Sequence, residues 1–157
     1  MTRPVQPDEP VPASSAQPVL FFDGECGLCN RLVRVLLRLD RRQVLRFAPL
    51  QGPAAQAYLR RHGLPTEDFD SLIFVPDWDR RDQPDYLMRT DGALAALGHC
   101  AGFGGIVRVV SLLPGSWRDA GYKVVARLRY RLFGRWVPRP LARAEWQRRF
   151  LDGPPPT

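Results

Sequence analysis

The sequence lacks the features that mark secreted, membrane-spanning or disulfide-stabilised proteins. Three cysteines in 157 residues are too few for the disulfide framework of a small secreted domain. No stretch approaches the roughly eighteen consecutive apolar residues of a spanning helix. The first eighteen residues hold five prolines but no apolar segment of signal-peptide length. These absences predict a soluble cytoplasmic protein with no transmembrane segment.

Lysine is also nearly absent, since Lys123 is the only lysine among 23 basic residues. The net charge of +7 is unevenly distributed along the chain. Residues 1–100 contain 12 arginines and 13 acidic residues, a net charge of −1, whereas residues 101–157 contain 11 basic and 3 acidic residues, a net charge of +8. The basic charge of residues 101–157 is compatible with a weak contact to an anionic surface or with a simple solvated face, and no nucleic-acid-binding motif accompanies it.

The first half of the chain alternates strand and helix signals after a proline-rich tail, residues 1–18, that we expect to be disordered. Residues 19–22 form an apolar run that ends at Asp23-Gly24, which predicts a buried strand. From Cys26 to Asp40, apolar residues recur at helical spacing opposite arginines, which predicts an amphipathic helix. A second strand and a second helix are expected at residues 44–47 and 53–62.

The next segment predicts a hairpin followed by a short helix. Residues 71–75 carry the strongest strand signal of the chain, and residues 86–89 provide a partner strand. Thr90 and Asp91 offer N-cap chemistry for a helix that Gly98 ends. The resulting β-α-β-α-β-β-α order predicts an α/β fold with a thioredoxin-like core, which we place at residues 19–101.

After residue 101 the pattern is helical, with breaks at Pro114-Gly115 and at Pro138 and Pro140. Charged residues recur four apart, at Asp119, Lys123, Arg127, Arg131 and Arg135, and an apolar stripe is formed by Val125, Leu128 and Leu132. This pattern predicts a basic C-terminal helical extension over residues 102–150 that packs on the sheet domain. A disordered tail is expected over residues 151–157.

Cys26 and Cys29 are separated by two residues and lie where the first strand gives way to a helix. The unpaired N–H groups and the dipole at a helix N-terminus stabilise a thiolate. This position favours a redox dithiol in which Cys26 is the exposed nucleophile and Cys29, more buried, is the resolving thiol. Asp23, three residues before Cys26, would raise the pKa of the thiol as a nearby ionised carboxylate, or it would accept the proton that Cys29 loses, and both roles stay open at this point.

The cysteine pair is also compatible with roles that involve no redox chemistry. A Cys-x-x-Cys pair is half of a zinc site in some proteins, and His99 and Cys100 would be the remaining ligands here. Two buried, inert cysteines are a further alternative, and Cys100 by itself is expected to be a small core residue. The chain could also be a non-catalytic thioredoxin-like binding module, with or without zinc, that docks an acidic partner through its basic extension.

The segment FFDGECGLCN resembles the signature of the DCC family of thiol-disulfide oxidoreductases, with Asp23, Cys26 and Cys29 in its Asp-x-x-Cys-x-x-Cys pattern. The similarity covers roughly residues 19–135 and continues through the segments LRFAPLQG, SLIFV, TDGA and LPGSWRDAGYKVVARLRYRLFGR. The sequence departs from the pattern at two places. Trp136 stands where many members have another cysteine, and no proline precedes Ser71, where thioredoxins have their cis-proline.

The resemblance implies a thioredoxin-like fold with a redox-active dithiol. Together with the residues, it predicts a small bacterial-type enzyme that reduces or exchanges the disulfide of a protein or of a small thiol. An unidentified electron donor and no cofactor are expected. The cytoplasm, where we expect the protein, is a reducing compartment, which favours reduction of disulfides over their formation.

Overall fold

A four-stranded mixed sheet forms the centre of the protein, as seen in a computed structural model that describes residues 16–69, 71–100, 102–137, 139 and 141–153. The strands are β1 (Val19–Phe22), β2 (Arg46–Pro49), β3 (Ile73–Val75) and β4 (Leu87–Met88), in the order β2-β1-β3-β4. β1 is parallel to β2 and antiparallel to β3, and β3 is antiparallel to β4. The two tails expected to be disordered fall largely on residues 1–15 and 154–157, outside the described residues.

Five α-helices and two 3₁₀-helices accompany the sheet in the described part of the chain. They are α1 (Gly27–Leu39), α2 (Pro53–Arg61), η1 (Trp78–Arg80), α3 (Arg89–Gly98), α4 (Gly104–Ser111), α5 (Gly115–Phe133) and η2 (Ala144–Arg149). From β1 to α3, strands and α-helices follow the order β-α-β-α-β-β-α, and further helices come after it. The predicted α/β fold, a thioredoxin-like core with C-terminal helices, is therefore confirmed.

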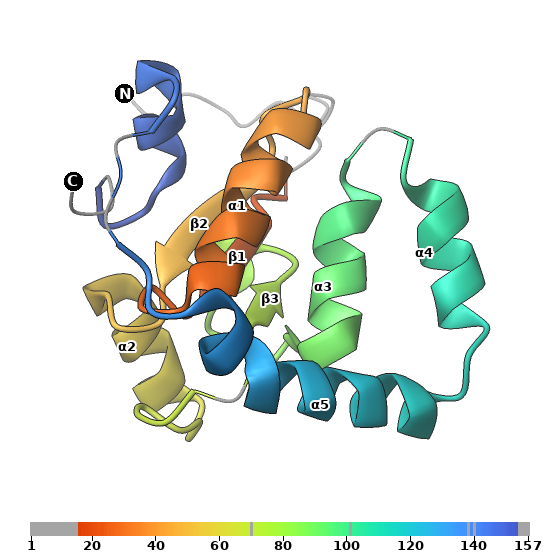
Figure 1. Cartoon of the computed structure of the whole chain (residues 1–157). Coiled ribbons are helices and arrows are strands. Elements are labelled where there is room, and N and C mark those ends of the chain that lie inside the picture. The colour runs from red at the N-terminus through yellow and green to blue at the C-terminus, as the bar shows by residue number, and fades with distance from the viewer. Residues whose placement is uncertain (1–15, 70, 101, 138, 140, 154–157) are drawn as a thin grey trace, which may run out of the picture.

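Both faces of the sheet are covered, which explains the uninterrupted apolar sequence of β1 (Figure 1). Leu20 and Phe22 belong to the core cluster that contains the buried residues of α1 and α3. Val19 and Phe21 point the other way, into a second cluster with α2. β1 thus lies between two hydrophobic layers, and the turn at its end is held on a rigid base.

The start of α3 differs from the prediction, because neither Thr90 nor Asp91 is its N-cap. The helix begins at Arg89, after Met88 in an extended conformation, and the cap residue makes no side-chain hydrogen bond. The Thr90 hydroxyl instead donates to the Arg118 carbonyl at 3.2 Å, and Asp91 forms an ion pair with the Arg118 side chain. These polar groups therefore attach α5 to the start of α3.

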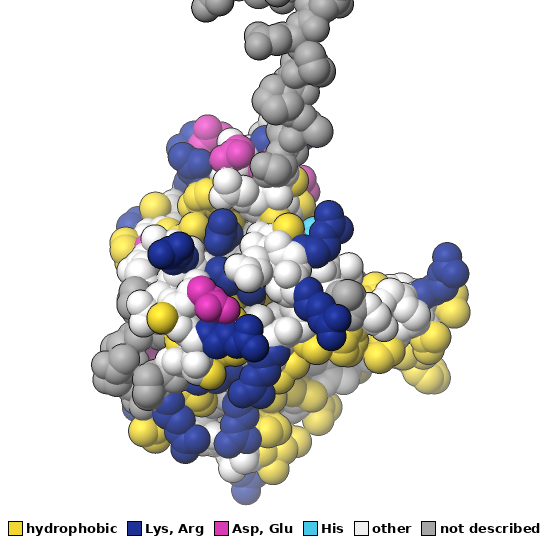
Figure 2. Space-filling view, turned by 90° about the horizontal axis from the view of Figure 1, so that it is seen from above, with side chains coloured by type: hydrophobic (Ala, Val, Ile, Leu, Met, Phe, Trp, Pro, Cys, Tyr) yellow, Lys and Arg dark blue, Asp and Glu magenta, His cyan; other side chains and the backbone are white. Residues whose placement is uncertain are grey.

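α4 projects beside α3 with a largely exposed apolar surface. Figure 2 shows hydrophobic side chains gathered on the side of the molecule where α4 lies in Figure 1. The exposed apolar residues of α4 and the following turn include Ile106, Val109, Leu112 and Leu113. Within the part of the chain that the structure describes, no helix is both long and apolar enough to cross a membrane.

α5 crosses the ends of α1 and α3 (Figure 1). The face that it turns toward the core is not the one that its apolar stripe predicts. Val125 and Leu132, from that stripe, are 50% and 70% exposed. The least exposed residues of the helix are spaced three or four apart on another face and include Arg118, Tyr122, Ala126, Arg129 and Phe133. The inward face is therefore mostly polar, because its side chains bind specific groups on the core and do not fill an apolar surface.

The C-terminal segment is tied to the core by a buried ion pair between Arg149 and Asp40, 2.5 Å apart. The Arg149 guanidinium also donates to the Leu45 carbonyl at 3.0 Å, and Asp40 accepts the Leu45 N–H at 2.8 Å. Leu151, which lies in the segment expected to be disordered, donates its N–H to the Phe47 carbonyl at 3.0 Å. The end of the described chain thus runs alongside β2.

Replacing Arg149 by methionine is expected to lower the free energy of unfolding by about 3–5 kcal/mol, because the Asp40 carboxylate would lose its buried counter-charge. Chemical denaturation measures the change, with Arg148→Met as the matched control, since Arg148 is exposed. Equal denaturation midpoints for the two variants would show that this ion pair does not stabilise the fold.

Candidate active site

Cys26 is the N-cap of α1, so the structure places its sulfur where the unpaired N–H groups of the helix begin. The Cys29 N–H donates to Cys26 Sγ at 3.4 Å, which also brings the two cysteines together. The Asn30 amide donates to the carbonyls of Gly24 and Cys26, at 2.8 and 3.0 Å, and holds the turn between β1 and α1 in place. Both cysteines are free thiols in this structure.

The surroundings of the two sulfurs shift their pKa values in opposite directions. The hydrogen bond from the Cys29 side chain is the main cause that lowers the pKa of Cys26 from 9.0 to about 6, and the Cys29 N–H and the charge of Arg129 lower it further against the effect of burial. The same hydrogen bond, together with burial, raises the pKa of Cys29. Cys26 is thus the thiolate of the pair at neutral pH.

Arg129, from α5, connects the dithiol to Asp23. Its Nη1 lies 3.8 Å from Cys29 Sγ, and its Nη2 lies 3.4 Å from Asp23 Oδ2. A second hydrogen bond joins Nη2 to the Phe69 carbonyl. Because the side chain is buried, its charge is poorly screened and acts directly on the neighbouring sulfurs.

Asp23 is buried and accepts contacts from three separate parts of the chain. Its Oδ1 accepts the Glu25 N–H at 3.0 Å and the Gln51 side-chain amide at 2.9 Å. Its Oδ2 accepts the Tyr130 hydroxyl and lies beside Arg129. The carboxylate therefore fixes the turn before Cys26, the loop after β2 and α5 relative to one another.

The exposure of the two cysteines differs from the prediction. Cys26 was expected to be the exposed one, but it is fully buried, whereas Cys29 is 9% exposed. The cover over Cys26 is the segment after α5, residues 134–136, which pairs antiparallel with the turn residues before α1. Gly27 N donates to the Gly134 carbonyl at 3.1 Å, and Trp136 N donates to the Glu25 carbonyl at 2.7 Å.

The close approach of this covering segment to the start of α1 requires glycine at two positions, Gly27 and Gly134. A Cβ atom on Gly27 would collide with the Phe133 carbonyl, and Gly134 adopts a φ of +64°, which other residues rarely do. Trp136 lies beside Glu25 in this segment, so the position at which the sequence departs from the DCC pattern is next to the cysteine pair.

The candidate zinc ligands His99 and Cys100 do not join the cysteine pair. Cys100 is buried, and its sulfur lies 3.8 Å from the Ala96 carbonyl, while His99 packs on the Phe74 ring with centroids 5.8 Å apart. In the described ranges, no three side chains of His, Cys, Asp or Glu gather closely enough to hold a metal ion. The geometry therefore gives no set of ligands for the zinc alternative.

Comparison with known proteins agrees with the geometry of the cysteine pair. Residues 20–135 match the DCC1-like thiol-disulfide oxidoreductase family. The chain belongs to this family. It is 31% identical over 133 residues to the uncharacterized protein YuxK of Bacillus subtilis, covering 85% of this chain and 93% of the relative.

A chloroplastic DCC family protein of Arabidopsis thaliana is also 31% identical, over 120 residues that cover 76% of this chain and 66% of the relative. No solved structure matches the chain significantly. The DCC1-like match includes β1 to α5, so it contains both the cysteine pair and the helix that supplies Arg129 and Tyr130.

Arg129, Tyr130 and Gln51 are parts of this site that were not predicted from the sequence. Arg129 and Tyr130 lie in the segment RLRYRLFGR, which resembles the DCC1-like family but whose own pattern predicts only a basic helix. The resemblance to the family was the one signal that could have pointed to Arg129 and Tyr130. No sequence periodicity relates their segment to the cysteines, because the two lie too far apart along the chain. Gln51 lies in the segment LRFAPLQG, which also resembles the family, but no pattern in the residues themselves pointed to it.

Two replacements of Cys29 are expected to separate the causes of the low pKa of Cys26. Cys29→Ala removes the side-chain donor and should raise the pKa of Cys26 well above about 6, whereas Cys29→Ser keeps a donor and should retain part of the shift. The ultraviolet absorbance of the thiolate, followed against pH in a Cys100→Ser background, measures both values, since Cys26 is then the one cysteine left in the chain. Coincident titration curves for the two variants would contradict this cause.

Proposed function

We propose that this protein is a thiol-disulfide oxidoreductase that reduces or exchanges the disulfide of a protein or of a small thiol in the cytoplasm. The observation that carries the proposal is the position of Cys26 Sγ at the N-terminus of α1, in contact with Cys29. A pKa of about 6 makes Cys26 largely a thiolate at neutral pH, which is the form that attacks disulfides. Membership of the DCC1-like family supports the same chemistry.

The reaction requires two exchanges between sulfur atoms. Cys26 Sγ attacks one sulfur of the substrate, a new disulfide to Cys26 forms, and the other substrate sulfur leaves as a thiolate that takes a proton from water. Cys29 then loses its proton and attacks Cys26 Sγ, and the second substrate sulfur leaves as a thiolate that takes a proton from water. The substrate gains two electrons and the protein keeps a Cys26–Cys29 disulfide, which a thiol electron donor reduces again.

Arg129 and Asp23 have distinct parts in this proposal. Arg129 stabilises negative charge on whichever sulfur carries it, since its guanidinium contacts Cys29 and its charge lowers the pKa of Cys26. Asp23 holds Arg129 in place through their buried ion pair. As the buried carboxylate next to this arginine, Asp23 is also the proposed acceptor of the Cys29 proton in the second exchange.

The experiment that tests the proposal is an equilibrium titration of the cysteine pair in graded thiol-disulfide buffers, with alkylation of free thiols and mass spectrometry of the products. A reversible two-electron transition confined to Cys26 and Cys29, at a potential between about −270 and −120 mV, is expected. If the pair forms no disulfide over this range, the protein is not a dithiol oxidoreductase. The alternative function, a non-catalytic thioredoxin-like binding module, is then favoured.

Single replacements are expected to separate the roles of the two cysteines. Cys26→Ser should abolish disulfide reduction, because the attacking thiolate is lost, whereas Cys29→Ser should accumulate a mixed disulfide on Cys26. Non-reducing mass spectrometry detects the trapped species, and Cys100→Ser is the control that should react as the wild type does. A mixed disulfide trapped on Cys29 in Cys26→Ser, with none in Cys29→Ser, would reverse the assignment.

A further inference from the structure

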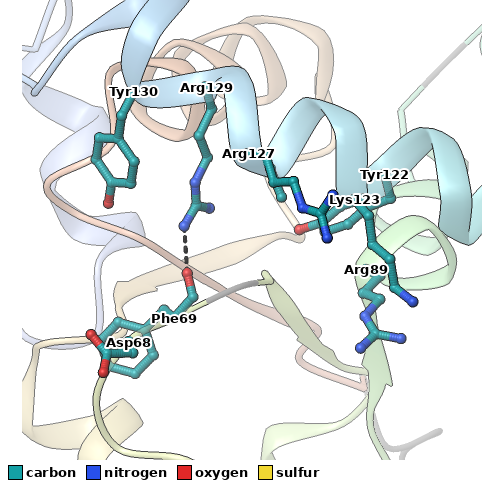
Figure 3. A pocket seen from close by; sticks show the side chains of 9 residues that line it. Asp68, Phe69, Arg89, Tyr122, Lys123, Arg127, Arg129 and Tyr130 are labelled. Atoms are coloured by element: carbon teal, nitrogen blue, oxygen red, sulfur yellow. Dashed lines mark hydrogen bonds between the residues drawn. The ribbon is translucent and has the colours of Figure 1, made fainter.

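A cavity of about 500 Å³ lies between α5 and the segment before β3. Figure 3 shows α5 above this cavity, with cationic side chains extending from it, and Asp68 and Phe69 on the opposite side. Its volume is in the range of sites that bind small molecules. The residues that line it are Asp68, Phe69, Arg89, Tyr122, Lys123, Ala126, Arg127, Arg129 and Tyr130.

The lining of the cavity is strongly cationic, with four basic side chains and one carboxylate among the described residues. The pair between Arg89 and Asp119, at 3.6 Å, is nearly half exposed to solvent and binds its arginine weakly. The Tyr122 hydroxyl accepts the Leu72 N–H at 3.1 Å, so its own proton can be donated to a ligand. Such a lining attracts an anion that also accepts hydrogen bonds.

Arg129 joins the cavity to the dithiol, since the same side chain lines the cavity and lies 3.8 Å from Cys29 Sγ. The residue is only 6% exposed, and its Nε finds no hydrogen-bond partner among the described residues. A ligand in the cavity would therefore sit against the side chain that contacts the reactive pair, with Lys123 and Arg127 further along α5 and Arg89 at the start of α3.

The backbone at the cavity is unusual at two positions. Asp68 and Arg89, in separate segments of the chain, adopt φ angles of +52° and +53°, which residues other than glycine rarely occupy. Both line the cavity. Conformations of this kind are concentrated at ligand sites, where the surrounding structure holds a side chain in a position that function requires.

We propose that this cavity binds the carboxylate groups of a small disulfide substrate, with Lys123 and Arg127 holding the carboxylates and Arg129 adjoining the disulfide. This proposal rests on the proposed function and deepens it, because it specifies a small anionic substrate and not a protein. Cys26 lies next to Cys29 but under residues 134–136, so the substrate reaches Cys26 when this segment moves aside.

The test compares two disulfides of similar length that differ in charge, 3,3′-dithiodipropionate, with two carboxylates, and the neutral 2-hydroxyethyl disulfide. The wild-type protein is expected to show a higher kcat/KM for dithiodipropionate. Replacing Lys123 and Arg127 together by glutamine should reduce the ratio of the two kcat/KM values by about tenfold, since two charge contacts are lost. Raising the ionic strength should reduce the same ratio in the wild type.

The matched control replaces Arg108 and Arg131 by glutamine, which removes the same charge from exposed positions that do not line the cavity. This control should keep the wild-type ratio. Octanedioate, the carbon analogue of dithiodipropionate, provides a readout without turnover, because it has the same two carboxylates and no disulfide. Calorimetry should show that it binds the wild type and the control about tenfold more tightly than Lys123→Gln/Arg127→Gln.

The outcomes distinguish the cavity from the redox function. If both disulfides are reduced with the same kcat/KM and octanedioate binding does not depend on Lys123 and Arg127, the cavity proposal is overturned while the redox function stands. If octanedioate binds through these residues but neither disulfide is reduced, the redox function fails, and so does the assignment of the ligand as a substrate. Charge-dependent reduction together with charge-dependent octanedioate binding supports the proposal.

Discussion

The buried carboxylate of Asp23 is the group on which the geometry of the site depends. A buried charge is costly unless hydrogen bonds and an opposite charge compensate it, and the donors to Asp23 come from the turn before α1, from Gln51 after β2 and from α5. The need to compensate the buried charge of Asp23 therefore fixes each of these segments relative to the cysteine pair. The ionic partner, Arg129, also places a positive charge 3.8 Å from Cys29 Sγ.

This arrangement makes the chemistry of the N-terminal cysteines depend on residues a hundred positions away. The β-α-β unit by itself supplies the helix N-terminus and the hydrogen bond between the two cysteines. α5 adds the arginine, and the segment after it adds the cover over Cys26. The Arg149–Asp40 pair then ties the end of the chain to the loop after α1. The C-terminal helices thus complete the site that the core begins.

The sequence predicts the elements that obey simple hydrophobic patterns. The apolar run of β1, the amphipathic α1 and the hairpin of β3 and β4 lie close to where they were expected, and the cysteine pair lies at the predicted helix start. The inward face of α5 could not be predicted, because Arg129 and Tyr122 face the core while Val125 and Leu132 face solvent. Hydrophobic periodicity assumes that apolar side chains are buried, and this helix packs through polar contacts instead. The burial of Cys26 was missed for a related reason, since a segment distant in sequence covers it.

The covered sulfur and its low pKa are linked through α5. The helix holds Arg129 beside the dithiol, and its C-terminal end leads directly into residues 134–136, which cover Cys26. A shift of α5 that uncovers Cys26 also changes the distance from Arg129 to the sulfurs, and hence the stability of the thiolate. An anion bound between α5 and the segment before β3 would hold the helix close to the core through its cationic side chains. If the anion is the proposed substrate, its binding energy keeps Arg129 beside the sulfurs while only the short covering segment moves, so that Cys26 is exposed without losing the part of its thiolate stabilisation that Arg129 supplies.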